Sequence, residues 1–171
     1  MPYTKENIIL IGMPTSGKST VGVITAKMLG MDFIDTDIVL QRREGRKLRD
    51  LIAAKGIDAF LAAEEKAVLS IQAKHTVIAT GGSVVYSEAA MKHLSEGAVV
   101  IYLKIELEEL RRRLTDIRGR GVVLHDGETL EQMFANRTAL YERYSDITIT
   151  ETGTIEDTVR AVMEAVERIG A

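Results

Sequence analysis

Residues 8–20 hold the feature that most constrains the fold, a short apolar run that breaks into a glycine-rich loop. Residues 8–11 read Ile-Ile-Leu-Ile, and residues 12–19 follow as Gly-Met-Pro-Thr-Ser-Gly-Lys-Ser before a helix-compatible stretch. Glycines let the backbone fold tightly around an anion, and the N-terminus of a following helix adds partial positive charge. The pattern predicts a phosphate-binding P-loop between a strand and a helix, with a purely structural glycine turn as the alternative.

The residue types within this loop predict a nucleoside triphosphate as its ligand. Lys18 would neutralise the outer phosphates, and the hydroxyl of Ser19 would bind Mg²⁺, which prefers oxygen ligands. The expected nucleotide-binding residues of the loop are Gly12, Met13, Pro14, Thr15, Ser16, Gly17, Lys18, Ser19 and Thr20.

Length and charge limit the classes of partner. The 171 residues fit one domain spanning residues 1–171, and a net charge of −3 supplies no broad cationic field for nucleic acid or for an anionic membrane. The chain has no cysteine, which excludes disulfides and thiolate metal sites and suits a reducing compartment. The first apolar run is too short for a signal peptide or a membrane span. We therefore expect a cytoplasmic monomer that binds small molecules.

Short apolar runs alternate with longer amphipathic segments along the chain. This pattern predicts an α/β fold in which five parallel strands, flanked by helices, form one sheet. A largely helical insertion at residues 37–74, with breaks at Gly45 and Gly56, separates the second and third strands. Residues 115–127 hold three glycines and two arginines, which is typical of a lid that closes over a phosphoryl-transfer site, although an ordinary surface loop is the alternative. The expected strands are residues 7–11, 32–35, 76–80, 98–103 and 146–150.

Two carboxylates follow the second strand, at the edge of the sheet where doubly wound folds bind ligands. Asp35 can hold the metal, and Asp37 can orient or deprotonate an acceptor hydroxyl. A capping role for Asp37 at the start of the next helix is the alternative. The paired glycines Gly81 and Gly82 follow the third strand at the same edge, where they permit close approach to a substrate or form a simple turn.

The remaining basic residues have less specific explanations. Arg113 lies late in a helix that begins near Glu106, where cations favour the helix C-terminus, although one arginine of this helix can still reach a nucleotide. A basic cluster in the insertion lacks interleaved aromatic residues, so we expect a solvated surface rather than a nucleic-acid site. The cluster consists of Arg42, Arg43, Arg46, Lys47 and Arg49.

The order of these motifs, which ends with Arg137-Thr-Ala-Leu-Tyr, resembles that of the shikimate kinases over nearly the whole chain. The resemblance implies a P-loop kinase fold and transfer of the ATP γ-phosphate to the 3-hydroxyl of shikimate, with Mg²⁺. It further implies that Asp37 binds the acceptor hydroxyl, that Gly81 and Gly82 belong to the substrate loop, and that Arg137 pairs with the shikimate carboxylate. Asp35 resembles the metal-associated aspartate, Arg113 an adenine-stacking arginine, and Arg120 a lid arginine that meets the phosphates.

The departures from the family pattern concentrate around the acceptor. Leu61 replaces a substrate-binding arginine, Ser83 replaces a third glycine and Ala139 replaces a proline, while the nucleotide half is intact. Loss of one charge-assisted hydrogen bond would weaken acceptor binding by about tenfold to a hundredfold. Two alternatives therefore stay open beside a shikimate kinase. One is a related kinase with a different acceptor, and the other is a regulatory nucleotide-binding protein without an acceptor.

Overall fold

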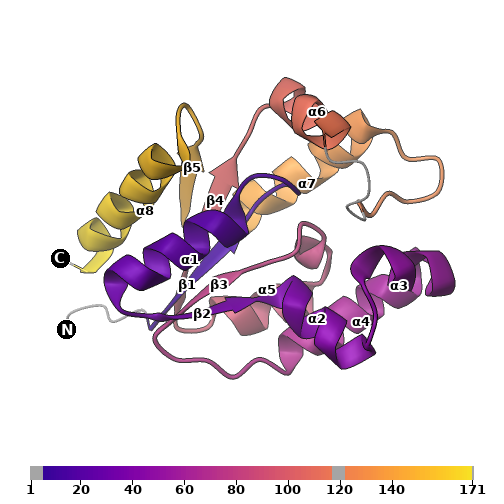
Figure 1. The fold of residues 1–171 in the computed structure, drawn as a ribbon, viewed down its shortest axis with the longest axis horizontal. Helices are drawn as coiled ribbons and strands as arrows, with labels where there is room; N and C mark the ends of the chain where they lie inside the picture. The colour runs from indigo at the N-terminus through magenta and orange to yellow at the C-terminus, as the bar shows by residue number, and fades with distance from the viewer. Residues whose placement is uncertain (1–5, 117–121, 171) are drawn as a thin grey trace.

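A five-stranded, entirely parallel sheet forms the centre of the molecule (Figure 1). The computed structural model describes residues 6–116 and 122–170. The strand order across the sheet is β2-β3-β1-β4-β5, so the chain starts in the middle, crosses to the edge at β2, returns to β3 beside β1 and then continues through β4 to the other edge at β5. This confirms the predicted fold class, and each expected strand lies within a residue or so of its expected ends. The strands are β1 (Asn7–Ile11), β2 (Asp32–Asp35), β3 (Thr76–Ala79), β4 (Ala98–Lys104) and β5 (Ile147–Thr150).

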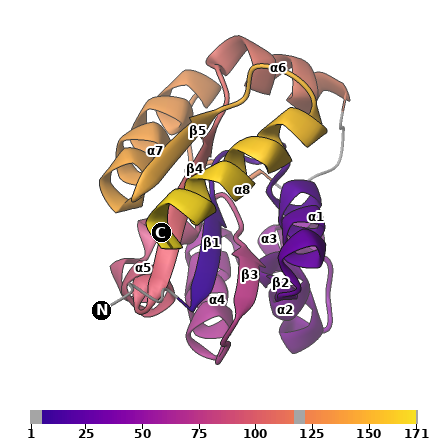
Figure 2. The ribbon, with the colours of Figure 1, turned by 90° about the vertical axis from the view of Figure 1, so that its left-hand side faces the viewer.

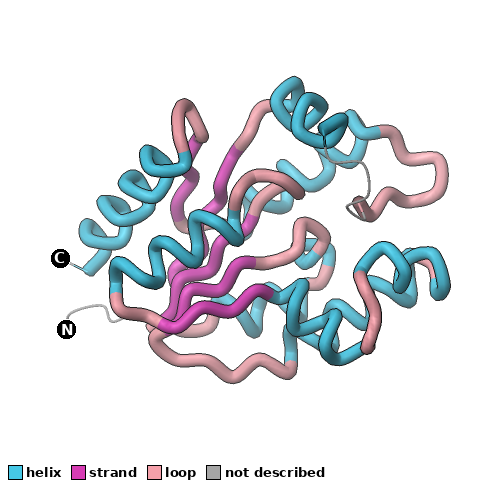
Figure 3. The backbone as a smooth tube through the Cα atoms, in the orientation of Figure 1, coloured by secondary structure: helices cyan, strands magenta, loops and turns pink. Residues whose placement is uncertain are grey.

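Helices cover both faces of the sheet (Figure 2 and Figure 3). α1 and α8 pack against each other on one face, while α4, α5, α7 and the short 3₁₀ helix η1 pack on the other. The described helices are α1 (Lys18–Leu29), α2 (Thr36–Glu44), α3 (Leu48–Lys55), α4 (Ile57–Leu69), η1 (Val84–Tyr86), α5 (Glu88–Ser95), α6 (Leu107–Asp116), α7 (Leu130–Tyr144) and α8 (Ile155–Gly170). None of these described helices is long and apolar enough to cross a bilayer.

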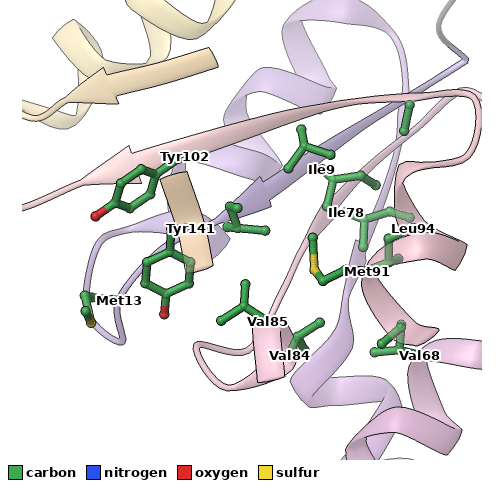
Figure 4. Packing of buried hydrophobic residues seen from close by; sticks show 14 of the residues in the cluster. Ile9, Met13, Val68, Ile78, Val84, Val85, Met91, Leu94, Tyr102 and Tyr141 are labelled. Carbon is green, nitrogen blue, oxygen red and sulfur yellow. The ribbon is translucent and has the colours of Figure 1, made fainter. Parts of the chain in front are cut away.

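The side-chain alternation of β1 explains why the sheet needs both helical layers. Ile8 and Leu10 face the α1 and α8 side, whereas Ile9 and Ile11 face the α4, α5 and α7 side. Successive residues of a strand point to opposite faces, so a strand that is apolar at every position must be covered twice. Figure 4 shows the second of these cores, where Tyr102 of β4 packs on a tyrosine of α7 with ring centroids 5.0 Å apart.

The insertion forms a smaller apolar cluster of its own. Gly45 and Gly56 adopt positive φ values of 64° and 79° and separate α2, α3 and α4, which confirms both predicted breaks. Only glycine adopts such backbone angles without strain, so each break redirects the chain sharply. The cluster, which we call the insertion core, contains Leu40, Leu51, Phe60, Ala63, Ala67 and Val123.

Candidate active site

A cavity of about 570 Å³ opens at the carboxyl edge of the sheet, where β1, β2 and β3 end. Its wall combines the P-loop with residues that follow the neighbouring strands and with the insertion. Parallel strands all point the same way, so the segments after them meet at one edge. The lining residues on which the following paragraphs depend are Thr15, Lys18, Ser19, Asp35, Asp37, Lys47, Arg49, Phe60, Glu64, Gly81, Gly82, Ser83, Val123 and Arg137.

The P-loop is held by contacts that require its two glycines. A side chain on Gly12 would put its Cβ 2.6 Å from the carbonyl oxygen of Leu103 in β4, so only glycine allows this approach. Gly17 has φ 82° and sits directly before α1, whose Val21 donates back to its carbonyl at 2.8 Å. Thr15 also adopts a positive φ of 69°, a conformation that non-glycine residues seldom adopt outside functional loops.

Lys18 is buried at the base of the cavity and held by the loop itself. Its ammonium donates to the carbonyls of Gly12 and Met13 at 2.8 and 2.7 Å and to the hydroxyl of Ser16 at 3.3 Å. Burial lowers the pKa of Lys18 to about 8, while the nearby Asp37 carboxylate opposes that decrease. A cation fixed in this way stabilises an anion at the loop without first having to be ordered.

Three of the nine expected loop residues do not line the cavity. Gly12, Met13 and Ser16 are buried behind it, and they hold Lys18 rather than face a ligand directly. The Met13 side chain points into the core near Tyr141 (Figure 4). Pro14, Thr15, Gly17, Lys18, Ser19 and Thr20 form the wall.

Ser19 and Asp35 form an oxygen pair suited to a hard cation. The Ser19 hydroxyl donates to Asp35 Oδ2 at 2.5 Å, and both residues line the cavity. Among the described residues, no cluster of three or more His, Cys, Asp or Glu side chains could hold a metal by itself. The hydroxyl of Ser19 and the carboxylate of Asp35 fit Mg²⁺, which takes few protein ligands and completes its shell with phosphate oxygens and water.

Asp35, rather than Asp37, caps α2. Asp35 Oδ1 accepts from the backbone N–H of Asp37 at 2.9 Å, so the capping role considered for Asp37 belongs to its neighbour. This leaves Asp37 in the first turn of α2 facing the cavity. Asp37 Oδ1 comes within 2.8 Å of the point that a Cβ on Gly81 would occupy.

Glu64 is a buried carboxyl in the cavity wall that was not among the predicted site residues. It lies on α4 and is 4% exposed, among the otherwise apolar buried positions Phe60, Ala63 and Ala67. Its Oε2 accepts from the Ser83 hydroxyl at 2.6 Å, and its Oε1 lies 2.6 Å from where a Cβ on Gly81 would be. Burial raises the pKa of Glu64 to about 7. A glutamate within an apolar helical stripe was the signal that could have identified it.

Arg137 of α7 is fully buried beside the same glycines. It donates to the carbonyl of Val123 at 2.5 Å and to the hydroxyl of Tyr86 at 3.2 Å, and its guanidinium lies over the Tyr86 ring. Its Nη1 would be 3.0 Å from a Cβ on Gly82, so this part of the guanidinium faces the glycine pair. A buried guanidinium at a cavity wall is suited to bind a carboxylate.

Arg113 of α6 contacts the P-loop without lining the cavity. It donates to the carbonyl of Thr15 and to Glu151, both at 2.8 Å, and to Glu109 at 2.6 Å. It does not line the cavity, so its expected contact with a nucleotide base stays a prediction. Arg120 lies outside the described residues. The lid was expected over residues 115–127, but residues 115–116 are the end of α6, and residues 122–127 form a loop whose Val123 packs into the insertion core.

Two features of the insertion extend the predictions made from the sequence. Lys47 and Arg49 are exposed, as expected for a solvated surface, and they also line the cavity, because the turn at Gly45 brings the start of α3 back over the site. Leu61 does not line the cavity. It packs against the insertion core, whereas its neighbour Phe60, a member of that core, also lines the cavity.

Comparison with known proteins gives a consistent result. A family model described as shikimate kinase matches residues 14–167. A shikimate kinase of Clostridium botulinum (strain Loch Maree / Type A3) is 34% identical over 167 residues, which cover 95% of this chain and 97% of that protein. The structure of a shikimate kinase from Acinetobacter baumannii in complex with shikimate aligns with a TM-score of 0.81 at 27% identity, covering 95% of this chain and 93% of that one. The shikimate kinase of Aquifex aeolicus aligns with a TM-score of 0.80 at 28% identity, with coverages of 94% and 96%.

Proposed function

The chain belongs to the shikimate kinase family, and from this premise we propose that it transfers the γ-phosphate of ATP to the 3-hydroxyl of shikimate. The observation that carries the proposal is the convergence of Lys18, Asp37 and Arg137 on one cavity. A phosphate-binding lysine, a carboxylate for a hydroxyl and a buried arginine for a carboxylate are the groups that a hydroxylated carboxylic acid requires beside ATP.

Positioning and charge stabilisation account for most of the proposed catalysis. The acceptor oxygen attacks the γ-phosphorus, the bond from that phosphorus to the β,γ-bridging oxygen breaks, and ADP leaves. Asp37 orients the attacking hydroxyl and takes its proton. Lys18 stabilises the negative charge on the transferred group, and Arg120 adds to it in the proposed closed lid. Gly81 and Gly82 let the acceptor approach the backbone closely.

The proposal includes Mg²⁺ as the cofactor that accompanies ATP. Ser19 and Asp35 would hold it directly or through water, and when bound it would neutralise charge on the phosphate oxygens. We further propose that residues 1–171 act as one domain, as a monomer in the cytoplasm, without nucleic acid or membrane partners. Light scattering on a size-exclusion column tests the oligomeric state.

Coupled detection of ADP over a panel of acceptors tests the proposed function. The panel contains shikimate, quinate, gluconate, homoserine and nucleoside monophosphates. We expect ADP release to require both Mg²⁺ and an acceptor, with shikimate preferred, and to stop when EDTA is added. ADP release at the same rate without any acceptor would contradict the kinase proposal, and preference for another acceptor would contradict shikimate as its substrate.

A further inference from the structure

Lys47 and Arg49, at the start of α3, are the cavity cations whose side chains make the fewest interactions with other described residues. The ammonium of Lys47 makes no hydrogen bond or ion pair with any described residue, although its backbone carbonyl accepts from Asp50 and Leu51 in the first turn of α3. Arg49 has an ion pair with Asp50, its neighbour in sequence, at 3.5 Å, and both side chains are mostly exposed. An exposed pair of this kind contributes little free energy. Both cations are therefore available to a ligand in the cavity.

The other cations in the described part of the cavity wall are already held by the protein. Lys18 donates to three oxygens of the P-loop, and Arg137 donates to Val123 and Tyr86. The acceptor end of the wall also carries the carboxyls of Asp37 and Glu64. A carboxylate bound near the ionised forms of these groups is repelled by them, which favours additional cations in the same wall.

The position of α3 assigns these two cations to the acceptor rather than to the base of the nucleotide. Leu48, which lies between them, packs against the insertion core, as does Val123, whose carbonyl accepts from Arg137. Arg113 of α6 donates to the carbonyl of Thr15 in the P-loop but does not line the cavity, and α6 and α3 are well separated in both views (Figure 1 and Figure 2). The start of α3 is thus on the side of the cavity that holds Arg137.

We propose that Lys47 and Arg49 bind the carboxylate of the acceptor together with Arg137, which makes the start of α3 a specificity-determining element. The inference rests on the proposed function. It also explains how a chain with leucine at position 61 selects an anionic acceptor, because α4 supplies Phe60 and Glu64 to the described wall but no cation. Ammonium and guanidinium groups form charge-assisted hydrogen bonds with carboxylates, and these are stronger than neutral ones.

The test compares the double variant Lys47→Met/Arg49→Met with the wild type on two acceptors, shikimate and its methyl ester. Methionine keeps much of the length of both side chains and removes their charge. The ester keeps the hydroxyls of shikimate but has no carboxylate. The matched control is Arg42→Met/Arg43→Met, which removes the same charge from the exposed last turn of α2, outside the cavity.

We expect the double variant to raise the KM for shikimate by about tenfold or more while the KM for ATP changes by less than about twofold. The preference of the wild type for shikimate over the ester should shrink by a similar factor. The control variant should keep the wild-type KM values for shikimate and for ATP.

Among the variants, three results would overturn the inference: an unchanged KM for shikimate, a rise mainly in the KM for ATP, or an equal rise in the control. The second would assign the cations to the phosphates. A wild type that neither phosphorylates shikimate nor binds it in calorimetric titration overturns the proposed function and the inference together. A wild type that does both, with unaffected variants, overturns only the inference.

Discussion

Ser83 and Glu64 form a buried hydrogen bond across the cavity wall, with the serine hydroxyl 2.6 Å from Glu64 Oε2. The two residues come from different elements, because Glu64 lies on α4 and Ser83 follows β3. The serine is the residue that departs from the third glycine of the family pattern, and here it donates to a carboxyl that is almost completely buried. A buried polar group without such a partner would be destabilising.

Ser83→Ala should raise the pKa of Glu64 further. The serine hydroxyl stabilises the charged carboxylate and so lowers a pKa that burial raises, which means that its removal leaves burial unopposed. The titration of Glu64 can be followed by NMR of the labelled side-chain carboxyl. A midpoint at or below that of the wild type would show that the hydrogen bond does not stabilise the ionised form.

Glu64→Gln should change how stability depends on pH. The pKa of Glu64 is about 7 in the folded protein and 4.5 in an unfolded chain, so the folded state holds the proton more tightly. The stability that this protonated carboxyl contributes is fully present below pH 4.5 and is lost as the pH rises through about 7. The loss is on the order of 3 kcal/mol for a shift of this size. Relative to the wild type, the variant should therefore become more stable between pH 5 and pH 8 in urea unfolding. Parallel pH curves for the two proteins would contradict this explanation.

Deprotonation of Lys18 should determine the pH above which kcat/KM for ATP decreases. Burial lowers the pKa of Lys18 to about 8, so the free enzyme loses the lysine charge as pH rises through that value. We expect kcat/KM for ATP to fall above about pH 8. Lys18→Ala should abolish ADP release, and Lys18→Arg should remove the alkaline decrease from whatever activity it retains, because arginine stays protonated. An unchanged alkaline decrease in the arginine variant would assign it to another group.

Gly81→Ala should impair acceptor use more than nucleotide binding. The new Cβ would lie 2.6 Å from Glu64 Oε1 and 2.8 Å from Asp37 Oδ1, so both carboxyls would have to move. We expect kcat/KM for shikimate to fall by more than about tenfold, with ADP binding unchanged in calorimetry. Gly170→Ala, at the end of α8 where a Cβ meets nothing within 4 Å, is the control. An unchanged kcat/KM for shikimate in Gly81→Ala would show that catalysis does not require Glu64 and Asp37 to stay in their present positions.

The sequence by itself determined the local structure and the identity of the phosphate-binding loop. The apolar runs fixed the strands, Gly45 and Gly56 fixed the breaks in the insertion, and the glycine pattern fixed the turn between β1 and α1. Each of these features depends on residues close together in the chain, because backbone angles and the spacing of apolar side chains are local properties. The sequence is therefore sufficient to predict them.

Only the tertiary structure decided which side chains face the cavity and what charge they carry there. It turned Leu61 toward the insertion core, brought Lys47 and Arg49 to the wall, and joined Glu64 to Ser83, 19 residues away in the sequence. Burial and hydrogen bonding depend on how separate elements pack, and a pattern within one segment contains no information about the partner that another segment will supply. The raised pKa of Glu64 therefore follows from the packing of α4 beside the loop after β3, not from the residue type.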